Sequence, residues 1–426
     1  MENGLLSLLI LACIIICFIT RVIPLGIVAV LGALAMALTG IISLEDALSS
    51  FGSDTVMLIL GMIVVGSALV ETGFIISIGE KLTRLPGICN NERIFLVLVL
   101  LIVVMLSGFM SNTATVAVFL PIVASVARCS GGVISKKNTY MAIGISSIIG
   151  GNLTLAGSTP QIIAQGILSQ TEGCEPMGFF DLAKGTFPLI ITMLLYFASF
   201  GYRLSRKVFT FPEEREGEAL IKETAGQPVR NGKALICGLI FLWCVVGFVF
   251  NIFTLGTVAI IAACLCIVTG CISVNRAAAT MDWTSILVLG GSMGFSKGLH
   301  QSGALIRIAD AVINLVGPAF GPTAMFGAFL VLAALMGNVM SHTATTAVLA
   351  PIAIAVAQSM GTTPTLFTVG VVIGCNLAFA TPVSTPPLTM TLCGGYRFKD
   401  YVIVGGMLNL ICVVIALVTL PLLYGV

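Results

Sequence analysis

The chain has 426 residues, of which 58% are hydrophobic and 9% are charged, against roughly 25% charged residues in an ordinary soluble domain. This composition excludes a soluble protein and indicates an integral membrane protein. The formal net charge of +2, with no concentrated basic patch, argues against a nucleic-acid partner.

Apolar runs follow one another from Leu5 to Leu423, and each can cross or nearly cross a hydrocarbon core of about 30 Å as a helix. In the first half we expect membrane-spanning helices at about 5–20, 22–41, 54–72, 139–170 and 185–202. The first run has no basic segment before it and no small-residue cleavage site after it. We therefore expect it to be kept as a span.

The apolar segment 93–128 is interrupted by the polar run SNTAT, so an unbroken helix of that length is not expected. Gly108, followed by Ser111, Asn112 and Thr113, favours a turn and then a helix N-cap. We predict a re-entrant helical hairpin here, which enters and leaves on one side of the membrane.

The sequence repeats itself with a shift of 230 residues. The shift aligns LGIVAVLGALAMALTGIIS (25–43) with LGTVAIIAACLCIVTGCIS (255–273), and MSNTATVAVFLPIVASVA (110–127) with MSHTATTAVLAPIAIAVA (340–357). Five crossings and one hairpin are an odd number, so the second copy must be inverted relative to the first. The predicted fold is an all-α membrane protein of two inverted repeats with broken helices at mid-membrane. Its parts are repeat 1–202 (hairpin 93–128), a linker at 203–233 and repeat 234–426 (hairpin about 322–358).

The placement of charged residues supports this topology. With the N-terminus outside, seventeen of the twenty Lys and Arg residues fall on the inner side, while Glu45, Asp46, Glu172 and Glu175 fall outside. We expect a multi-pass protein of the cell membrane, inner or plasma, with both termini outside and the linker on the cytoplasmic face.

Each half has a second break, at GGNLTLAGSTP (150–160) and at ATPVSTPP (380–387). Ser and Thr precede proline in both, which suits a half-helix with a hydroxyl N-cap and proline at its first position: Ser158, Thr159 and Pro160, and Ser384, Thr385 and Pro386. Four helix N-termini then start near mid-membrane, and their N–H groups and dipoles attract an anion without a buried Lys or Arg. Freed carbonyls with Ser, Thr and Asn oxygens suit sodium. The alternative is that these small polar residues serve helix packing.

These motifs resemble the divalent anion/sodium symporter family, which carries dicarboxylates, citrate or sulfate. The resemblance covers nearly the whole chain and includes the paired SNT-type motifs, the Thr-Pro breaks and DWTSILVLGGSMGFSKGLHQSG (282–303). It implies a homodimer in the lipid bilayer, a small anionic substrate, Na⁺ as coupling ion and an elevator-type alternating-access mechanism. Members commonly have eleven spans, whereas ten are counted here.

The resemblance also implies site residues. A first sodium site would use Ser107, Ser111, Asn112 and Gly157, with Ser158 at the same break, and a second would use Gly337, Met340, His342 and Ser384. The substrate-binding residues would be Ser111, Asn112, Thr113, Ser158, Thr159, Ser341, His342, Thr343, Thr385 and Pro386.

Three positions depart from the family pattern: His342 replaces Asn, Gln161 replaces a second proline, and Leu388 replaces an Asn. An Asn side chain offers an oxygen to sodium, whereas imidazole offers nitrogen or, when protonated, only donors. We hypothesise that His342 replaces a sodium site with a titratable group and so gives pH-dependent coupling or exchange. The alternative is a neutral His342 packed in the hairpin tip.

The function that the sequence favours is secondary active transport of a C4 or C5 dicarboxylate, with sodium coupling at least at the first site. Anion exchange, proton coupling without a second sodium site, and sulfate or citrate as substrate stay open. An enzyme is not expected, because the two histidines are isolated and the thirteen cysteines are scattered singly. An antiporter would keep Asp or Glu in the breaks, and a channel would show no saturation of flux.

Overall fold

The computed structural model describes residues 2–20, 22–75, 77, 91–211, 231–316, 321–382 and 384–425. Within these ranges the chain forms helices and no β-strand. Six of the described helical segments are long and apolar enough to cross a membrane, and four shorter apolar helices accompany them. The chain is therefore an all-α, multi-pass membrane protein, as its composition predicts.

The described helices of the first half follow the predicted spans closely. They are α1 (Glu2–Thr20), α2 (Leu25–Leu38), α3 (Leu44–Ser49), the 3-10 turn η1 (Ser50–Gly52), α4 (Asp54–Glu71), α6 (Glu92–Ser107), α7 (Asn112–Cys129), α8 (Lys136–Gly151), α9 (Thr159–Gln170), α10 (Asp181–Ala198) and α11 (Phe200–Val208). The expected interruption of the segment 93–128 lies between α6 and α7, and the break in the fourth span lies between α8 and α9.

The second half repeats this order. Its described helices are α13 (Asn231–Val249), α14 (Leu255–Val268), α15 (Val274–Ala279), α16 (Trp283–Gln301), α17 (Ala304–Val316), α18 (Pro322–Val339), α19 (His342–Ser359), α20 (Pro364–Asn376), α21 (Pro386–Thr391), η3 (Leu392–Gly394), α22 (Phe398–Asp400), the π-helical η4 (Tyr401–Gly405) and α23 (Gly406–Tyr424). Here too a hairpin, α18 and α19, precedes a broken helix, α20 and α21.

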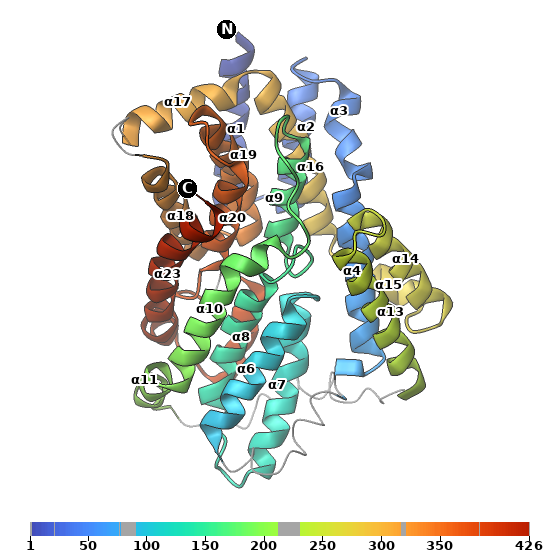
Figure 1. Ribbon diagram of the computed structural model, residues 1–426, viewed down its shortest axis with the longest axis vertical. Coiled ribbons are helices and arrows are strands. Elements are labelled where there is room, and N and C mark those ends of the chain that lie inside the picture. The colour runs from blue at the N-terminus through green and yellow to red at the C-terminus, as the bar shows by residue number, and fades with distance from the viewer. Residues whose placement is uncertain are drawn as a thin grey trace.

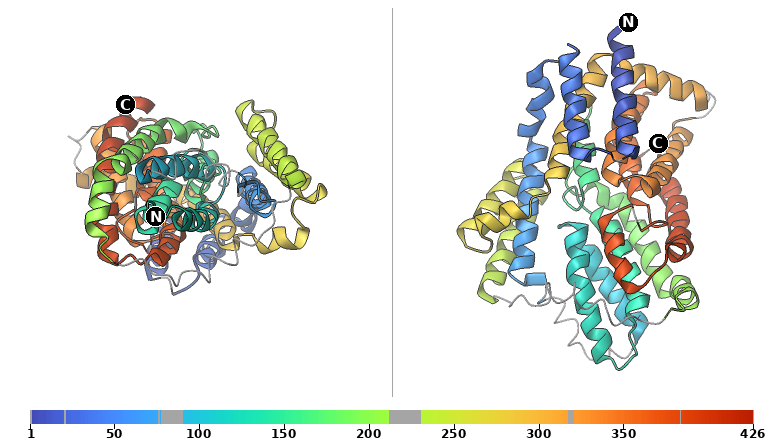
Figure 2. Two further views of the ribbon diagram at one scale, coloured as in Figure 1. Left: turned by 90° about the horizontal axis from the view of Figure 1, so that it is seen from below. Right: turned by 180° about the vertical axis from the view of Figure 1, so that it is seen from behind.

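The two helix pairs occupy opposite halves of the molecule. Figure 1 shows α6 and α7 in the lower half and α18 and α19 in the upper half, with α17 lying across the upper end. The view from behind in Figure 2 shows the same arrangement. Helices α4, α13, α14 and α15 stand together at one side of the bundle. The tip of the first hairpin contacts this group, because the ring of Phe109 meets that of Phe241 edge-on at 5.2 Å between centroids.

The two halves are interleaved by packing. Helix α2 packs along α16, and α4 packs along α14, so each pair joins one helix from each half. Ion pairs lie beside these contacts: Lys297 Nζ is 2.5 Å from Asp46 Oδ1, and Arg276 Nε is 3.8 Å from Glu71 Oε2. The long side chains of Glu71 and Lys297 thus have structural partners, as expected for charges near the ends of spans.

The boundaries of the two repeats and of the linker between them stay a prediction. Helix α11 covers the start of the expected linker 203–233, and α13 begins at Asn231. The middle of that linker, 212–230, lies outside the described residues.

Candidate substrate and ion site

A cavity of about 510 Å³ lies where the four broken helices begin. The first residues of α7, α9, α19 and α21 line it, together with the middle of α4. All ten residues expected to contact substrate are among its lining: Ser111, Asn112, Thr113, Ser158, Thr159, Ser341, His342, Thr343, Thr385 and Pro386. The structure thus gathers residues from opposite halves of the chain around one volume.

The hydroxyl groups at the four helix starts behave differently from the sequence prediction. Only Ser341 caps its helix with its side chain, because Ser341 Oγ accepts from Ala344 N at 3.2 Å. Ser111, Ser158 and Thr385 occupy N-cap positions but make no capping bond. The expectation of hydroxyl caps at the two Ser-Thr-Pro breaks is therefore wrong. Ser158 Oγ donates to Gln161 Oε1 instead, and Thr385 Oγ1 has no partner among the described residues.

The proline positions are confirmed to within one residue. Pro386 begins α21, whereas α9 begins at Thr159 and carries Pro160 at its second position. Proline is tolerated there because the first N–H groups of a helix have no intrahelical acceptor. The starts of α7, α9 and α21 have no side-chain cap, but Pro160, Pro386 and Pro387 carry no N–H, so α7 and α9 offer more first-turn N–H groups than α21 does.

The electrostatic character of the cavity comes from backbone and one carboxylate. Among its described lining residues there is no Lys or Arg, and the lone acidic side chain is Asp282. Asp282 caps α16, where Oδ1 accepts from Ser285 N at 3.2 Å. Asp282 therefore both caps α16 and reaches the cavity, although it was not among the predicted site residues. A negative solute here would have to be held by N–H and O–H donors.

Asn112 lies at the centre of a cluster of oxygen atoms. One terminal atom of its amide lies 2.7 Å from Ser107 Oγ, 3.0 Å from Ser147 O and 3.3 Å from Gly157 O. As the amide nitrogen, this atom can donate to these groups. As the amide oxygen, it joins two carbonyls and a hydroxyl around one point, which is the ligand type of a hard cation. Ser107 itself lies behind the cavity wall and is fully buried.

The expected second sodium site is less well assembled. His342 and Ser384 line the cavity, but Gly337 and Met340 do not. Gly337 packs so closely on the backbone of Cys375 that an added Cβ would lie 2.4 Å from the Cys375 carbonyl oxygen. His342 places Nδ1 at 2.9 Å from Asn376 Oδ1. Its Nε2 is buried without a partner among the described residues.

Buried amides connect His342 to the opposite half of the protein. Asn376 Nδ2 donates to Asn152 Oδ1 at 2.5 Å, and Gln161 Nε2 donates to the same oxygen at 2.9 Å. Asn152 and Asn376 are the matching residues of the two GGNL and GCNL segments. An Asn at each break is the signal that the sequence contains for this contact, and neither residue was among the predicted site residues.

A second polar contact crosses from α9 to α16. Thr159 Oγ1 lies 3.0 Å from Ser285 Oγ, and Ser285 Oγ donates to Asp282 Oδ2. The start of a cavity-lining helix is thereby tied to a helix of the other half. Spacing alone could not show this contact, because 126 residues separate Thr159 from Ser285.

An apolar, multi-pass protein in which the starts of four interrupted helices line one central cavity has the architecture of a secondary transporter. The sequence profile described as that of the citrate transporter matches residues 15–369. The chain therefore belongs to the citrate transporter family, within the divalent anion/sodium symporters that its motifs predict, and it is a transporter and not an enzyme.

Individual relatives agree with this assignment. An uncharacterized transporter of Haemophilus influenzae is 28% identical over 434 residues, covering 96% of this chain and 89% of that protein. The sodium-dependent dicarboxylate transporter SdcS of Staphylococcus aureus is 25% identical over 449 residues, covering 96% of this chain and 84% of that protein. The crystal structure of the YdaH transporter of Alcanivorax borkumensis is similar in fold, with a TM-score of 0.62 at 13% identity, covering 90% of this chain and 88% of that chain.

Proposed function

We propose that the protein is a secondary active transporter of a small divalent anion, with a C4 or C5 dicarboxylate as its substrate. The observation that carries this proposal is the meeting of the starts of α7, α9, α19 and α21 at one cavity. Helix starts offer N–H groups and the positive ends of dipoles, which bind carboxylates without a cationic side chain. SdcS, a relative matched over 84% of its own length, is named as a sodium-dependent dicarboxylate transporter.

Sodium is the coupling ion that the first site supports. Ser107 Oγ, Ser147 O and Gly157 O surround the Asn112 amide at distances of 2.7 to 3.3 Å. Oxygens from a hydroxyl, an amide and freed carbonyls form the ligand set expected where a helix is broken at mid-membrane. Ser111, at the start of α7, completes the predicted set from the cavity side.

A second candidate, favoured by His342, is coupling to a proton or exchange of anions in place of a second sodium. Of the four residues expected to form the second sodium site, two do not line the cavity, and one of the remaining two is a histidine. Imidazole takes up a proton near neutral pH, whereas it is a poor ligand for a hard cation.

The transport mechanism we propose is an elevator movement of the helices that carry the site. The contact from Thr159 to Ser285 joins α9 to α16, and that from Phe109 to Phe241 joins the tip of the first hairpin to the group of α4, α13, α14 and α15. Helices α16 and α4 pack against α9 beside these contacts, and an elevator movement would slide such packed helices past each other. The homodimer rests on the family resemblance alone.

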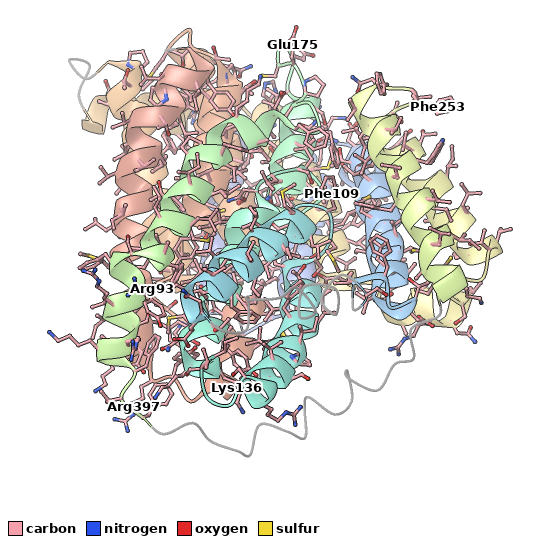
Figure 3. The ribbon with its side chains drawn as sticks, turned by 60° about the horizontal axis from the view of Figure 1, so that its bottom comes forward. Arg93, Phe109, Lys136, Glu175, Phe253 and Arg397 are labelled. Carbon is pink, nitrogen blue, oxygen red and sulfur yellow. The ribbon has the colours of Figure 1, made fainter. Side chains whose placement is uncertain are left out.

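The orientation we propose places both termini outside the cell membrane. Figure 3 shows Arg93, Lys136 and Arg397 toward one end of the molecule and Glu175 at the opposite end. Basic residues gather on the cytoplasmic side of membrane proteins. The end that carries these three residues would therefore be cytoplasmic.

A panel of anions tests the substrate. Succinate, malate, 2-oxoglutarate, citrate and sulfate are added to the purified protein with and without sodium, and the apparent Tm is measured. A ligand that binds the folded state at about 100 times its Kd stabilises it by about 2.7 kcal/mol. We expect a dicarboxylate to raise Tm more in sodium than in choline. Stabilisation by sulfate alone, or by none of these anions, would contradict the proposal.

A further inference from the structure

A second cavity, also of about 510 Å³, lies away from the substrate cavity and shares none of its described lining residues. It is lined by the start of α6, by the turn before α8 together with the start of that helix, and by one face of α11. Figure 3 shows Arg93 and Lys136, each next in sequence to a lining residue, toward one end of the molecule. The cavity therefore belongs to the end that carries the basic residues.

The Glu92 carboxylate joins the three elements that line this cavity. Its Oε1 accepts from Ser135 N at 2.8 Å and from Asn138 Nδ2 at 3.0 Å, and its Oε2 accepts from the hydroxyl of Tyr202. All three donors are neutral, and among the described residues Glu92 forms no ion pair. The cavity thus contains a carboxylate whose negative charge has no direct cationic partner.

Asn138 adds an acceptor that is not used. Its Nδ2 donates to Glu92, so the other terminal atom of the amide is the oxygen Oδ1. Asn138 lines the cavity and is only 7% exposed, and its Oδ1 has no hydrogen-bond partner in the described part of the chain. A buried acceptor without a donor costs free energy, so a ligand that brings an N–H or O–H to this wall is favoured.

Two cationic side chains line the same cavity. Lys137 Nζ donates to Phe211 O at 3.1 Å, which uses one of the ammonium hydrogens. The guanidinium carbon of Arg206 lies 5.9 Å from the centre of the Tyr202 ring. Neither cation forms an ion pair with a described residue. Both can therefore bind an oxyanion, and the planar fork of an arginine matches the oxygens of a phosphate.

The position of α11 places this cavity at the level of lipid headgroups. Helix α10, which precedes α11, is a candidate membrane span, and its residues Phe187 and Leu195 lie on one face and are each 62% exposed. On α11, Tyr202 is buried while Arg203 and Lys207 are exposed, and Figures 1 and 2 show this helix at the edge of the molecule. A basic amphipathic helix at the end of a span lies in the headgroup region.

We infer that this cavity binds a phosphoethanolamine group, and that the group is the headgroup of a phospholipid in the leaflet at this end of the protein. Lys137 and Arg206 donate to the phosphate, while the ammonium donates to Glu92 and Asn138. A choline headgroup has no N–H to donate, and a glycerol headgroup has no positive charge to offer the carboxylate. The inference does not depend on which anion the protein transports.

Lipid binding to the purified full-length chain tests this inference. Dioleoyl lipids with ethanolamine, choline or glycerol headgroups are titrated into the protein in detergent, and binding is measured by native mass spectrometry. We expect the ethanolamine lipid to bind about fivefold more tightly than the other two, because it alone supplies both a phosphate and an N–H-bearing cation. Equal binding of the three lipids would overturn the assignment.

Variants separate the two ends of the headgroup. Arg206→Gln should weaken binding of all three lipids by about tenfold, because each carries a phosphate. Glu92→Gln should remove the preference for ethanolamine over choline. Lys207→Gln is the matched control, since it removes the same charge from the same helix but does not line the cavity. Tm without added lipid shows whether each variant is folded.

The comparison of Arg206→Gln with Lys207→Gln decides the outcome even if Glu92→Gln does not fold. An equal loss of lipid binding in these two variants would mean a general attraction of lipid to a basic surface and would overturn the site.

Soluble compounds distinguish a lipid from a free ligand of the same chemistry. We expect phosphoethanolamine to compete with the ethanolamine lipid, and inorganic phosphate to compete less well because it lacks the ammonium. Raised Tm with soluble phosphoethanolamine, but none with the ethanolamine lipid, would overturn the lipid as the source of the group.

Discussion

Gly61 on α4 lies against the backbone of Ala259 on α14, where an added Cβ would lie 2.4 Å from the Ala259 carbonyl carbon. The same kind of crossing occurs 230 residues away. A Cβ added to Gly291 on α16 would lie 2.5 Å from the carbonyl carbon of Ala29 on α2. Shifting Gly61 and Ala259 by 230 in opposite directions gives Gly291 and Ala29. The two halves of the chain therefore contact each other in a reciprocal way.

Stability should depend on these two crossings. Gly61→Ala and Gly291→Ala should each destabilise the protein by about 1–3 kcal/mol, because a methyl group at 2.5 Å from backbone must push two helices apart. The measurement is Tm in detergent. Gly232→Ala on α13 is the control, since nothing lies within 4 Å of its added Cβ. Equal Tm values for all three variants would contradict the close crossings.

Sodium dependence should weaken in Ser107→Ala. Ser107 Oγ faces Asn112 and donates to Ser147 O at 2.7 Å, so its loss removes one oxygen from the first sodium site. If the lost oxygen contributes about 1–1.5 kcal/mol to the binding free energy of sodium, the half-saturating sodium concentration rises roughly tenfold. Uptake of a dicarboxylate into proteoliposomes at varied sodium measures this.

The matched control for Ser107 is Ser146→Ala. Ser146 is equally buried on α8 but donates to Ile143 O, away from the cavity. We expect its half-saturating sodium concentration to stay at the parent value. The sodium site would be refuted if Ser107→Ala kept the parent sodium curve while retaining uptake.

The pH profile of uptake should change in His342→Asn. Asn removes the ring that takes up a proton but restores the amide found in the family motif, so uptake should lose its pH dependence and gain steeper dependence on sodium. Proteoliposome uptake between about pH 5 and 8 measures both effects. His300→Asn, on the exposed end of α16, should leave the profile unchanged. Identical pH profiles in the parent and His342→Asn would show that His342 is a packed, neutral side chain.

Substrate affinity should increase in Asp282→Asn. The carboxylate of Asp282 lines the anion cavity, and Asn keeps the helix cap because both residues are good N-caps. Removing one like charge at the rim of the site is worth about 1 kcal/mol, or roughly fivefold in Kd for the anion. Ser285→Ala, which breaks the contact with Thr159 without changing charge, separates this effect from loss of structure. Weaker anion binding in Asp282→Asn would mean that Asp282 holds a cation that the anion requires.

Local sequence patterns were sufficient to place the helix interruptions. The interruption at Gly108 and Ser111 lies between α6 and α7. Pro160 and Pro386 stand within the first two positions of α9 and α21, where proline is tolerated. The hydrogen-bond partners of the hydroxyl groups could not be predicted from these local patterns. Ser158 bonds to Gln161 instead of capping α9, because Gln161 offers a buried acceptor one turn away.

The sequence alone determined that this chain is a membrane protein with four broken helices. The features that did so are its composition, the 230-residue repeat and the polar interruptions of its apolar runs. These features depend on each segment and its neighbours in sequence, so the sequence alone carries them. Only the tertiary structure decided that Asn152 meets Asn376, that Asp282 reaches the cavity, and that Thr159 touches Ser285. Such contacts depend on how distant helices pack, and side-chain packing over more than a hundred residues of separation leaves no periodic signal in a single sequence.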